Sequence, residues 1–258
     1  MSEKTVVKGI VLRETQTKEA DKILTVLTAE YGRISVIARG ARRRGSKIAA
    51  AAELFAFSEM VLYEQKNWWM LDEASVIALF DGVRQDVELL SLAAYFAEMT
   101  EAVTDVNMPC GEILSLLLNA LYALDTLKRP QSSVKAAFEL RLMSLAGYAP
   151  LLDDCAECGA AEPDAPRFDV TEGVIFCKKC APAFGELLPL DTASLSAMRF
   201  VTHTGREKLF SFRLEGQAMR LFADACERFA FMQLERPFRT LDFYRSLQQT
   251  TSDFGEKQ

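Results

Sequence analysis

The chain has 258 residues, of which 50% are hydrophobic and 26% charged, and its formal net charge is −6. This length allows one large domain or two to three small ones. No apolar run approaches the ~20 residues of a membrane-spanning helix, and the N-terminus lacks the apolar core of a signal peptide, so we expect a cytoplasmic protein without membrane contact. In that compartment, six cysteines favour free thiols or a metal site over disulfides.

Positive charge is concentrated near the N-terminus. Residues 1–50 hold 11 Lys and Arg against 5 Asp and Glu, a net charge of +6, so residues 51–258 carry −12. Between Arg33 and Lys47 there are six basic residues and no acidic one. Such a cluster is typical of a polyanion site, with nucleic acid as the first candidate, although charge runs are often only solvated loops.

Short strands are expected over the first 80 residues, because branched and alternating apolar side chains recur between turn residues. They lie at 7–13, 22–28, 33–38, 56–63 and 68–71, with one helical turn at 48–52. Five strands in this length predict a small barrel of the OB type over residues 1–80. An SH3-like barrel has a similar strand count, so the periodicity alone does not separate the two.

The hydrophobic period changes to that of helices from residue 83 onward. Helices are expected at 83–106, 113–124, 132–147, 192–201 and 215–234. They predict a helical domain made of residues 81–150 and 186–248, followed by a flexible polar tail at 249–258. The predicted fold class is therefore α+β and multidomain.

Two cysteine pairs, Cys155-Ala-Glu-Cys158 and Cys177-Lys-Lys-Cys180, lie within an insert at 151–185. Two residues between thiols let one tight turn aim both sulfurs at one point, and two such turns complete a tetrahedral site. This spacing predicts one structural Zn²⁺ in a four-cysteine module, because four protein ligands leave no position for water or substrate. A dithiol redox pair, which should come singly within a βαβ pattern, and an iron–sulfur cluster, which has its own spacings, are the alternatives.

Groups for catalysis are not evident in the sequence. Cys110 and Cys226 lie among apolar neighbours and are expected to be inert buried thiols, and the single histidine, His203, is expected at a helix end in a surface or capping role. Asp153-Asp154 is expected to form a turn, and the sequence has no glycine-rich nucleotide-binding loop. The protein is therefore predicted not to be an enzyme and to use no nucleotide cofactor.

The nucleic-acid site is expected on the barrel, with basic side chains along phosphates and aromatic rings against bases. The candidate phosphate contacts are Arg13, Arg33, Arg39, Arg42, Arg43, Arg44 and Lys47. The candidate stacking residues are Tyr31, Phe57, Tyr63, Trp68 and Trp69, and for each of them core packing is an equally good interpretation. Neutralising six phosphates predicts a log–log salt slope of about −4 on single strands.

Three blocks of sequence resemble one known family. The N-terminal block contains Gly9-Ile10-Val11-Leu12-Arg13, Glu19–Leu24, Leu27–Arg33 and Ala38-Arg39-Gly40-Ala41-Arg42. The other two are Phe138–Leu142 with Gly147-Tyr148-Ala149-Pro150, and Glu172–Cys177, where Glu172 replaces a common glycine. In this order they resemble the bacterial RecO family of recombination mediators, over about residues 5–185.

The resemblance implies an OB-fold, a helical domain and a zinc module, without enzymatic activity. It also implies binding of single- and double-stranded DNA, annealing of complementary strands and, with the partner RecR, help in loading RecA onto DNA coated by single-strand-binding protein (SSB), in the bacterial cytoplasm at the nucleoid. The acidic SSB tail would bind a pocket in the helical domain. Candidate cations for that pocket are Arg129, Arg141 and Arg199.

Two other functions fit parts of the sequence. An RNA- or ribosome-binding protein would share the barrel, the basic cluster and the zinc module, and binding to SSB or its tail peptide would separate it from the RecO interpretation. A metal-dependent nuclease or hydrolase needs an open metal position or clustered carboxylates and histidines, which the sequence does not suggest.

Overall fold

The structure is a computed structural model that describes residues 3–255, and the chain divides into two compact units. The barrel unit holds described residues 3–117 and 240–255, and the metal unit holds residues 118–239. One boundary falls within helix α3 (Gly111–Asp125), between Leu117 and Leu118. No helix among the described residues is long and apolar enough to cross a membrane.

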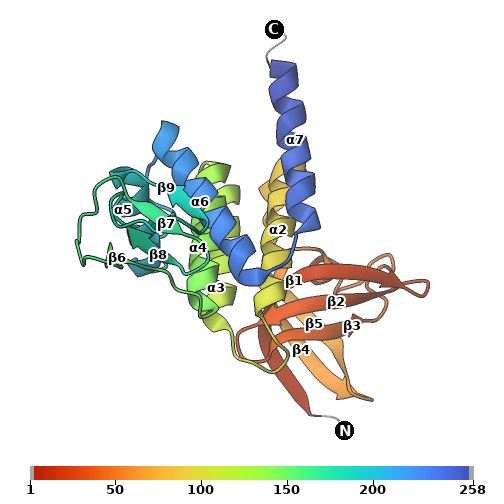
Figure 1. Ribbon diagram of the computed structural model, residues 1–258. Helices are drawn as coiled ribbons and strands as arrows, with labels where there is room; N and C mark the ends of the chain where they lie inside the picture. The colour runs from red at the N-terminus through yellow and green to blue at the C-terminus, as the bar shows by residue number, and fades with distance from the viewer. Residues whose placement is uncertain (1–2, 256–258) are drawn as a thin grey trace. The chain divides into compact units, whose positions relative to one another are not determined.

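Five strands close a barrel in the order β1-β2-β3-β5-β4 (Figure 1). They are β1 (Lys4–Thr17), β2 (Asp21–Thr28), β3 (Gly32–Ala38), β4 (Phe57–Gln65) and β5 (Trp68–Ala78). All neighbours pair antiparallel except β3 and β5, which pair parallel at Val36↔Trp69 and Ile37↔Met70. This Greek-key arrangement confirms the predicted OB-type barrel over the SH3-like alternative.

Alternation along the strands builds the barrel core. In β3, Ile34, Val36 and Ala38 are buried inside, while Ser35 between them is exposed. The strands are longer than the apolar segments predicted. Glu14–Thr17 still pair with β2 because a hairpin satisfies the backbone whatever the side chains are, and a register shift between Val11 and Arg13 bends β1.

The loop at residues 104–110 lies along the turn between β2 and β3. The backbone N–H of Arg33 donates to the carbonyl of Asp105 (3.2 Å), and that of Asn107 donates to Tyr31 (2.9 Å). Gly32 has φ +61°, and a Cβ there would collide with the carbonyl oxygens of Asp105 and Met108. Only glycine allows this approach, which places the loop against the outer side of the barrel.

The helix predicted at 83–106 is divided into α1 (Asp81–Gln85) and α2 (Val87–Val103). The break falls at Asp86, whose carboxylate accepts from the backbone N–H groups of Glu88 (2.9 Å) and Leu89 (3.0 Å) and so caps α2. A 3-10 turn, Ala50–Ala52, stands where a helical turn is expected.

The last helix, α7 (Arg239–Gly255), lies alongside α2 (Figure 1). Glu98 on α2 accepts hydrogen bonds from the backbone N–H and the hydroxyl of Thr240. Residues 249–255 of the expected flexible tail are therefore helical, and 256–258 lie outside the described residues.

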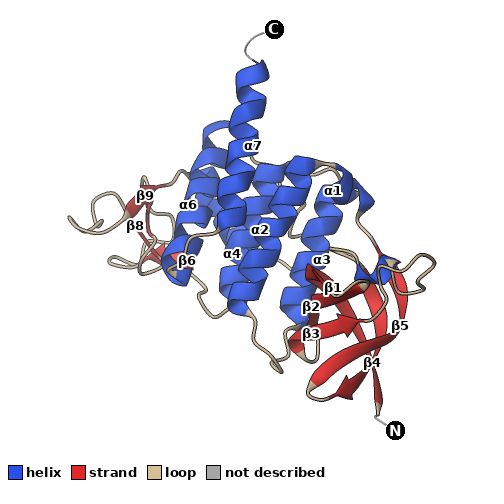
Figure 2. Ribbon diagram, turned by 90° about the vertical axis from the view of Figure 1, so that its right-hand side faces the viewer, coloured by secondary structure: helices blue, strands red, loops and turns tan. Residues whose placement is uncertain are grey.

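The metal unit combines helices with a small sheet (Figure 2). Its helices α4 (Gln131–Leu145), α5 (Thr192–His203) and α6 (Gly216–Leu234) pack on one another. Its sheet has the order β6-β8-β7-β9, from β6 (Leu151–Cys155), β7 (Arg167–Asp169), β8 (Val174–Phe176) and β9 (Leu187–Pro189). The sheet thus continues past residue 185, and the turn predicted at Asp153-Asp154 is wrong because both residues belong to β6.

Candidate metal centre and nucleic-acid surface

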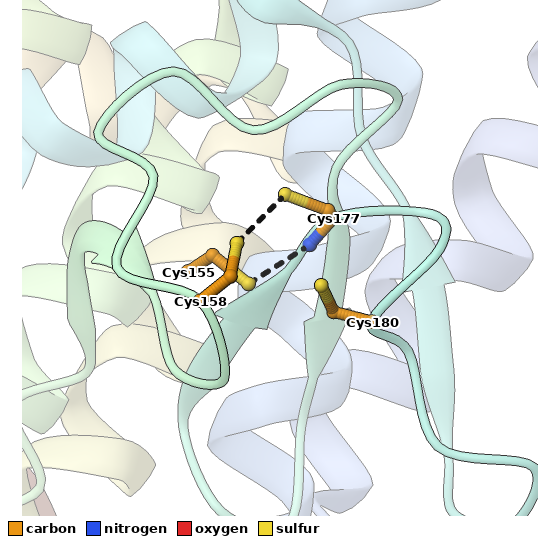
Figure 3. A group of neighbouring side chains, drawn as sticks. All are labelled: Cys155, Cys158, Cys177 and Cys180. Carbon is orange, nitrogen blue, oxygen red and sulfur yellow. Dashed lines mark hydrogen bonds between the residues drawn. The ribbon is translucent and has the colours of Figure 1, made fainter.

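The four cysteines of the predicted module come together at one point (Figure 3). The sulfurs of Cys155, Cys158, Cys177 and Cys180 all lie within 4.8 Å of one another, and those of Cys158 and Cys177 are 3.7 Å apart. Four thiolates around a tetrahedral ion with metal–sulfur bonds of about 2.3 Å would be separated by about 3.8 Å. The group can therefore hold a metal ion with little rearrangement.

Each cysteine pair forms a tight turn. The carbonyl of Cys155 accepts from the N–H of Gly159 (2.9 Å), and the carbonyl of Cys177 accepts from the N–H of Cys180 (3.0 Å). Gly159 has φ +70°, the conformation that favours glycine. The turns bring the pairs face to face, and the backbone N–H of Cys177 donates to the sulfur of Cys155 at 3.3 Å (Figure 3).

The thiols differ in acidity. Burial opposes ionisation of Cys155, but hydrogen bonds from the backbone N–H groups of Cys158 and Cys177 outweigh it and lower its pKa to about 6. The hydrogen bond with the Cys158 thiol, and then burial, raise the pKa of Cys180 to about 12. Four thiolates so close together repel one another, so a cation is needed to hold them all ionised.

Arg199 on α5 attaches the cysteine module to the helices. Its Nε donates to the carbonyl of Leu152 (2.7 Å), and its Nη2 donates to those of Asp153 (2.8 Å) and Ala161 (2.6 Å). These carbonyls flank the first cysteine pair, so the guanidinium fixes the backbone that carries Cys155 and Cys158. This role was missed from the sequence, where Arg199 is a candidate for a tail pocket, because nothing local marks a partner some 40 residues away.

Two of the remaining candidates in the metal unit, Arg141 and His203, also have structural contacts. Arg141 donates to the carbonyl of Thr202 at 2.6 Å, near the end of α5. His203, the last residue of α5, is exposed and its Nδ1 lies 2.8 Å from the carbonyl oxygen of Arg199, which agrees with a surface role. Arg129 lies between α3 and α4, and its Nε is buried without a hydrogen-bond partner among the described residues.

The two other cysteines have distinct surroundings. Cys226 is fully buried on α6, and burial raises its pKa well above the ordinary value. Cys110 is only half-buried, so the prediction of a buried thiol is wrong for it. Its sulfur donates to the carbonyl of Thr28 at 3.2 Å, and burial, then the charge of Glu30, raise its pKa to about 11.

The basic loop, residues 39–49 between β3 and the 3-10 turn, stands at one end of the barrel. Two backbone hydrogen bonds hold the first part of the loop. The N–H of Gly40 donates to the carboxylate of Asp21 (2.8 Å), and the N–H of Arg42 donates to the carbonyl of Ala20 (2.9 Å). Beyond it, three cations are exposed and form no ion pair within residues 3–255. They are Arg43, Arg44 and Lys47.

The other basic candidates have partners. Arg13 and Arg33 share the carboxylate of Glu101, at 3.0 and 3.5 Å, which offsets part of their charge. Arg39 donates to the side-chain oxygen of Gln65 at 2.9 Å, and the guanidinium of Arg42 donates to a backbone carbonyl at 3.3 Å. Within the described part of the chain, the structure therefore leaves Arg43, Arg44 and Lys47 without side-chain partners, gives Arg39 and Arg42 neutral partners only, and pairs Arg13 and Arg33 with a carboxylate.

The aromatic candidates divide by exposure. Trp68 is 43% exposed, whereas Trp69 is half-buried against the barrel core with the ring of Tyr31 5.7 Å away. Phe57 and Tyr63 on β4 are also half-buried. The β4–β5 hairpin thus presents one tryptophan to solvent and holds the other as part of the barrel wall.

Comparison with known proteins accounts for nearly the whole chain. Residues 1–80 match the family model described as recombination protein O N terminal, and residues 84–242 match the one described as recombination protein O C terminal. The chain belongs to the RecO family. This confirms the resemblance drawn from the sequence motifs. The first matched region ends just after β5, and the second begins within α1.

Three curated relatives are each named DNA repair protein RecO, and each aligns with this chain over most of its length. A DNA repair protein RecO from Acetivibrio thermocellus is 32% identical over 239 residues, 93% of this chain and 95% of the relative. One from Anaeromyxobacter dehalogenans is 35% identical over 231 residues, 88% and 91% of the two chains. A third, from Caldicellulosiruptor bescii, is 29% identical over 241 residues, 93% and 98% of the two. This RecO-family chain is thus similar to proteins of DNA repair along both units.

Proposed function

We propose that this RecO-family chain is a DNA repair and recombination mediator that binds single- and double-stranded DNA through its basic loop. The observation that supports it best is the group of exposed cations, Arg43, Arg44 and Lys47, with no carboxylate partner within residues 3–255. Such cations on an OB-type barrel attract phosphates without reading sequence.

The proposed activity needs no catalytic group. Two complementary strands repel each other through their phosphates, so a protein that neutralises the backbone promotes annealing by lowering that repulsion. We include in the proposal the assistance of RecA loading onto SSB-coated strands together with RecR, and binding of the SSB tail. The chain acts here as a binding protein in the bacterial cytoplasm and not as an enzyme.

The metal in this proposal is one structural Zn²⁺. Four cysteine sulfurs suit zinc, which prefers tetrahedral thiolate ligation, and they would occupy every coordination position. Bound there, the ion would supply fixed geometry to the β6–β9 module and no reaction chemistry. Cys155, Cys158, Cys177 and Cys180 would hold it, while Arg199 fixes the backbone of the first turn.

The test of DNA binding replaces Arg43, Arg44 and Lys47 by Ala together. Three lost phosphate contacts should reduce the log–log salt slope on single-stranded DNA by about 2, and affinity at low salt should fall at least tenfold. Fluorescence anisotropy of a labelled oligonucleotide across a salt titration measures both quantities.

A matched control removes the same charge from the metal unit. Arg206, Lys208 and Arg213 are exposed and form no ion pair among the described residues, so their triple replacement by Ala leaves the basic loop intact. We expect the control to keep most of the salt slope. Equal losses in the two triple variants would mean that only net charge matters and would remove the basic loop from the proposal.

An RNA- or ribosome-binding role is the alternative. Competition by structured RNA against labelled single-stranded DNA, and binding of an SSB tail peptide to the full chain, decide between the two. Stronger binding of the RNA together with no binding of the tail peptide would favour the alternative.

A further inference from the structure

A pocket of about 460 Å³ opens on the outside of the barrel beside the β4–β5 hairpin. Its size falls within the range of about 300–1,000 Å³ that is typical of small-ligand sites. Trp68 and Trp69 both line it, and they are the only tryptophans of the sequence. The rest of the lining consists of two apolar side chains, Ile34 and Val106, and four polar ones. The polar ones are Ser35 from β3, Glu64 and Asn67 from the hairpin, and Asn107 from the loop after α2.

The two tryptophans differ in how firmly they are held. Trp69 is half-buried, packs on the barrel core and has Tyr31 5.7 Å from its ring, so it forms a fixed wall. Trp68 is 43% exposed at the pocket, so its ring is accessible to a ligand. An accessible indole beside amide and hydroxyl groups offers a planar ligand one face to stack on and partners for its polar edge.

The charge of the lining indicates which part of a nucleic acid fits. The residues that line the pocket include Glu64 but, among those that the structure describes, no Lys or Arg. A phosphate entering it would meet a carboxylate and no cation in the lining, since the neighbouring Lys66 lines a separate, adjoining hollow. A nucleobase carries no charge, and its N–H groups can donate to Glu64 while Asn67 and Asn107 pair with the remaining edge.

The basic loop begins close to this pocket. Arg39 donates to Gln65 at 2.9 Å and so joins the start of the loop to the hairpin that carries Glu64 and Trp68. Ser35 in the pocket is four residues before Arg39, about 13 Å along an extended strand. Phosphates of one strand held by the basic loop therefore have bases within reach of the pocket.

We propose that this pocket receives one unstacked nucleobase of the single strand whose phosphates the basic loop holds. The inference rests on the proposed DNA-binding function and adds a ligand-specific subsite to it. Double-stranded DNA, whose bases are stacked and paired, would not enter, so the pocket favours single strands over duplexes.

The experiment compares two probes of equal length and charge, a labelled (dT)15 and a 15-mer of abasic sugar phosphates. Anisotropy reports binding of each, and intrinsic tryptophan emission reports on the pocket because both tryptophans line it. We expect (dT)15 to change the tryptophan emission and to bind about tenfold more tightly than the abasic strand. This ratio of dissociation constants corresponds to the stacking of about one base. The salt slopes of the two should agree.

Variants separate the pocket from general effects. Trp68→Ala should weaken (dT)15 about tenfold and leave the abasic strand unchanged, and that unchanged affinity also shows that the variant is folded. Phe184→Ala is the matched control, because Phe184 is 90% exposed and lies in the metal unit. It should change neither affinity.

The outcomes distinguish this inference from the function on which it rests. Equal affinity for (dT)15 and the abasic strand, or saturation by (dT)15 with no change in tryptophan emission, overturns the pocket while DNA binding stands. If neither strand binds at low salt, the proposed function fails together with the inference.

Discussion

The six cysteines differ in chemistry because their surroundings differ. Four lie in two facing turns with their sulfurs within 4.8 Å of one another, Cys226 is enclosed by the core of the metal unit, and Cys110 is half-buried and donates to the carbonyl of Thr28. Distance and solvent access therefore determine which thiols can bind an ion and which cannot. The metal-site thiols and Cys110 should accordingly respond in different ways to substitution and to alkylation.

Loss of one metal-site sulfur should remove the metal. Cys177→Ala leaves three ligands, so zinc content measured by plasma mass spectrometry should fall from one ion per chain toward zero, and the free energy of unfolding should fall by more than about 3 kcal/mol. Cys110→Ser, which removes a thiol elsewhere, should retain the full metal content. Zinc-free wild-type protein, purified without chelator, would contradict the assignment of zinc.

Cys110 should react slowly with iodoacetamide. Its pKa of about 11 lies about two units above the ordinary value, so at pH 8 the thiolate fraction is about 100-fold lower than that of an unperturbed thiol. The rate should rise about tenfold per pH unit from pH 8 to 10, because the thiolate increases until the pH reaches the pKa. Peptide mass spectrometry of alkylated protein measures it, and a rate that levels off above about pH 9, as for a thiol of ordinary pKa, would refute the shifted pKa.

For individual side chains, the sequence predicts those contacts that local spacing determines. Two residues between thiols are enough to place Cys155 beside Cys158, and the second turn repeats the pattern. The partners of Arg13 and Arg199 depend on contacts 88 and about 40 residues away, which no local pattern records. For that reason only the structure shows which cations have a partner and which are free.

Among the helices, α5 supports the cysteine module. Strand β6 carries Asp153 and Cys155, and α5 holds the carbonyls beside them through Arg199. Three charge-assisted hydrogen bonds to carbonyls that are adjacent in space reduce the freedom of the first cysteine turn before any ion binds. The module thus depends on α5 as well as on its own sheet.

Arg199→Ala should destabilise the metal unit by about 2–3 kcal/mol, because three backbone carbonyls lose a charged donor. Arg199→Lys should recover little, since an ammonium cannot reproduce the planar fork. Urea unfolding followed by far-UV circular dichroism measures the change. The exposed Arg206→Ala is the control and should cost under about 0.5 kcal/mol; an equal loss there would show that Arg199 has no special role.

The ends of helices and strands were predictable where the apolar pattern of the sequence changes. They were not predictable where a partner segment determines how far the element extends. The break at Asp86 has a recognisable capping residue, yet the apolar pattern runs through it. The extension of β1 to Thr17 and the helix α7 consist largely of polar residues. The first pairs with β2, and the start of α7 is bonded to α2 through Thr240 and Glu98. These tertiary contacts have no local signal in the sequence.

Charge, tryptophans and metal-site cysteines are each concentrated in one part of the chain. Residues 1–50 carry +6 and the rest −12, and both tryptophans lie in the barrel unit while all four metal-site cysteines lie in the metal unit. Each unit contains its own buried side chains. A change confined to one unit can therefore be measured separately from the other.

Removal of the metal by a chelator should destabilise the metal unit and leave the barrel unit unchanged. The thermal midpoint of the transition seen by circular dichroism should fall by about 10 °C or more, since the small β6–β9 module loses its cross-link. Tryptophan emission at 25 °C should stay unchanged, because the tryptophans report on the barrel. A shift of that emission on chelation would show that the metal also stabilises the barrel unit.

The basic loop is fastened at both ends by residues that do not supply its free charge. Asp21 holds the N–H of Gly40, and the buried ammonium of Lys22 binds the carbonyl of Ala52 and the carboxylates of Glu14 and Glu53. Between these anchors, Ala41 and Ile48 are buried in the barrel core, whereas residues 42–45 and Lys47 are exposed. In terms of design, the charge of these exposed positions, and with it the attraction for a polyanion, can be changed while the packing of the barrel is kept.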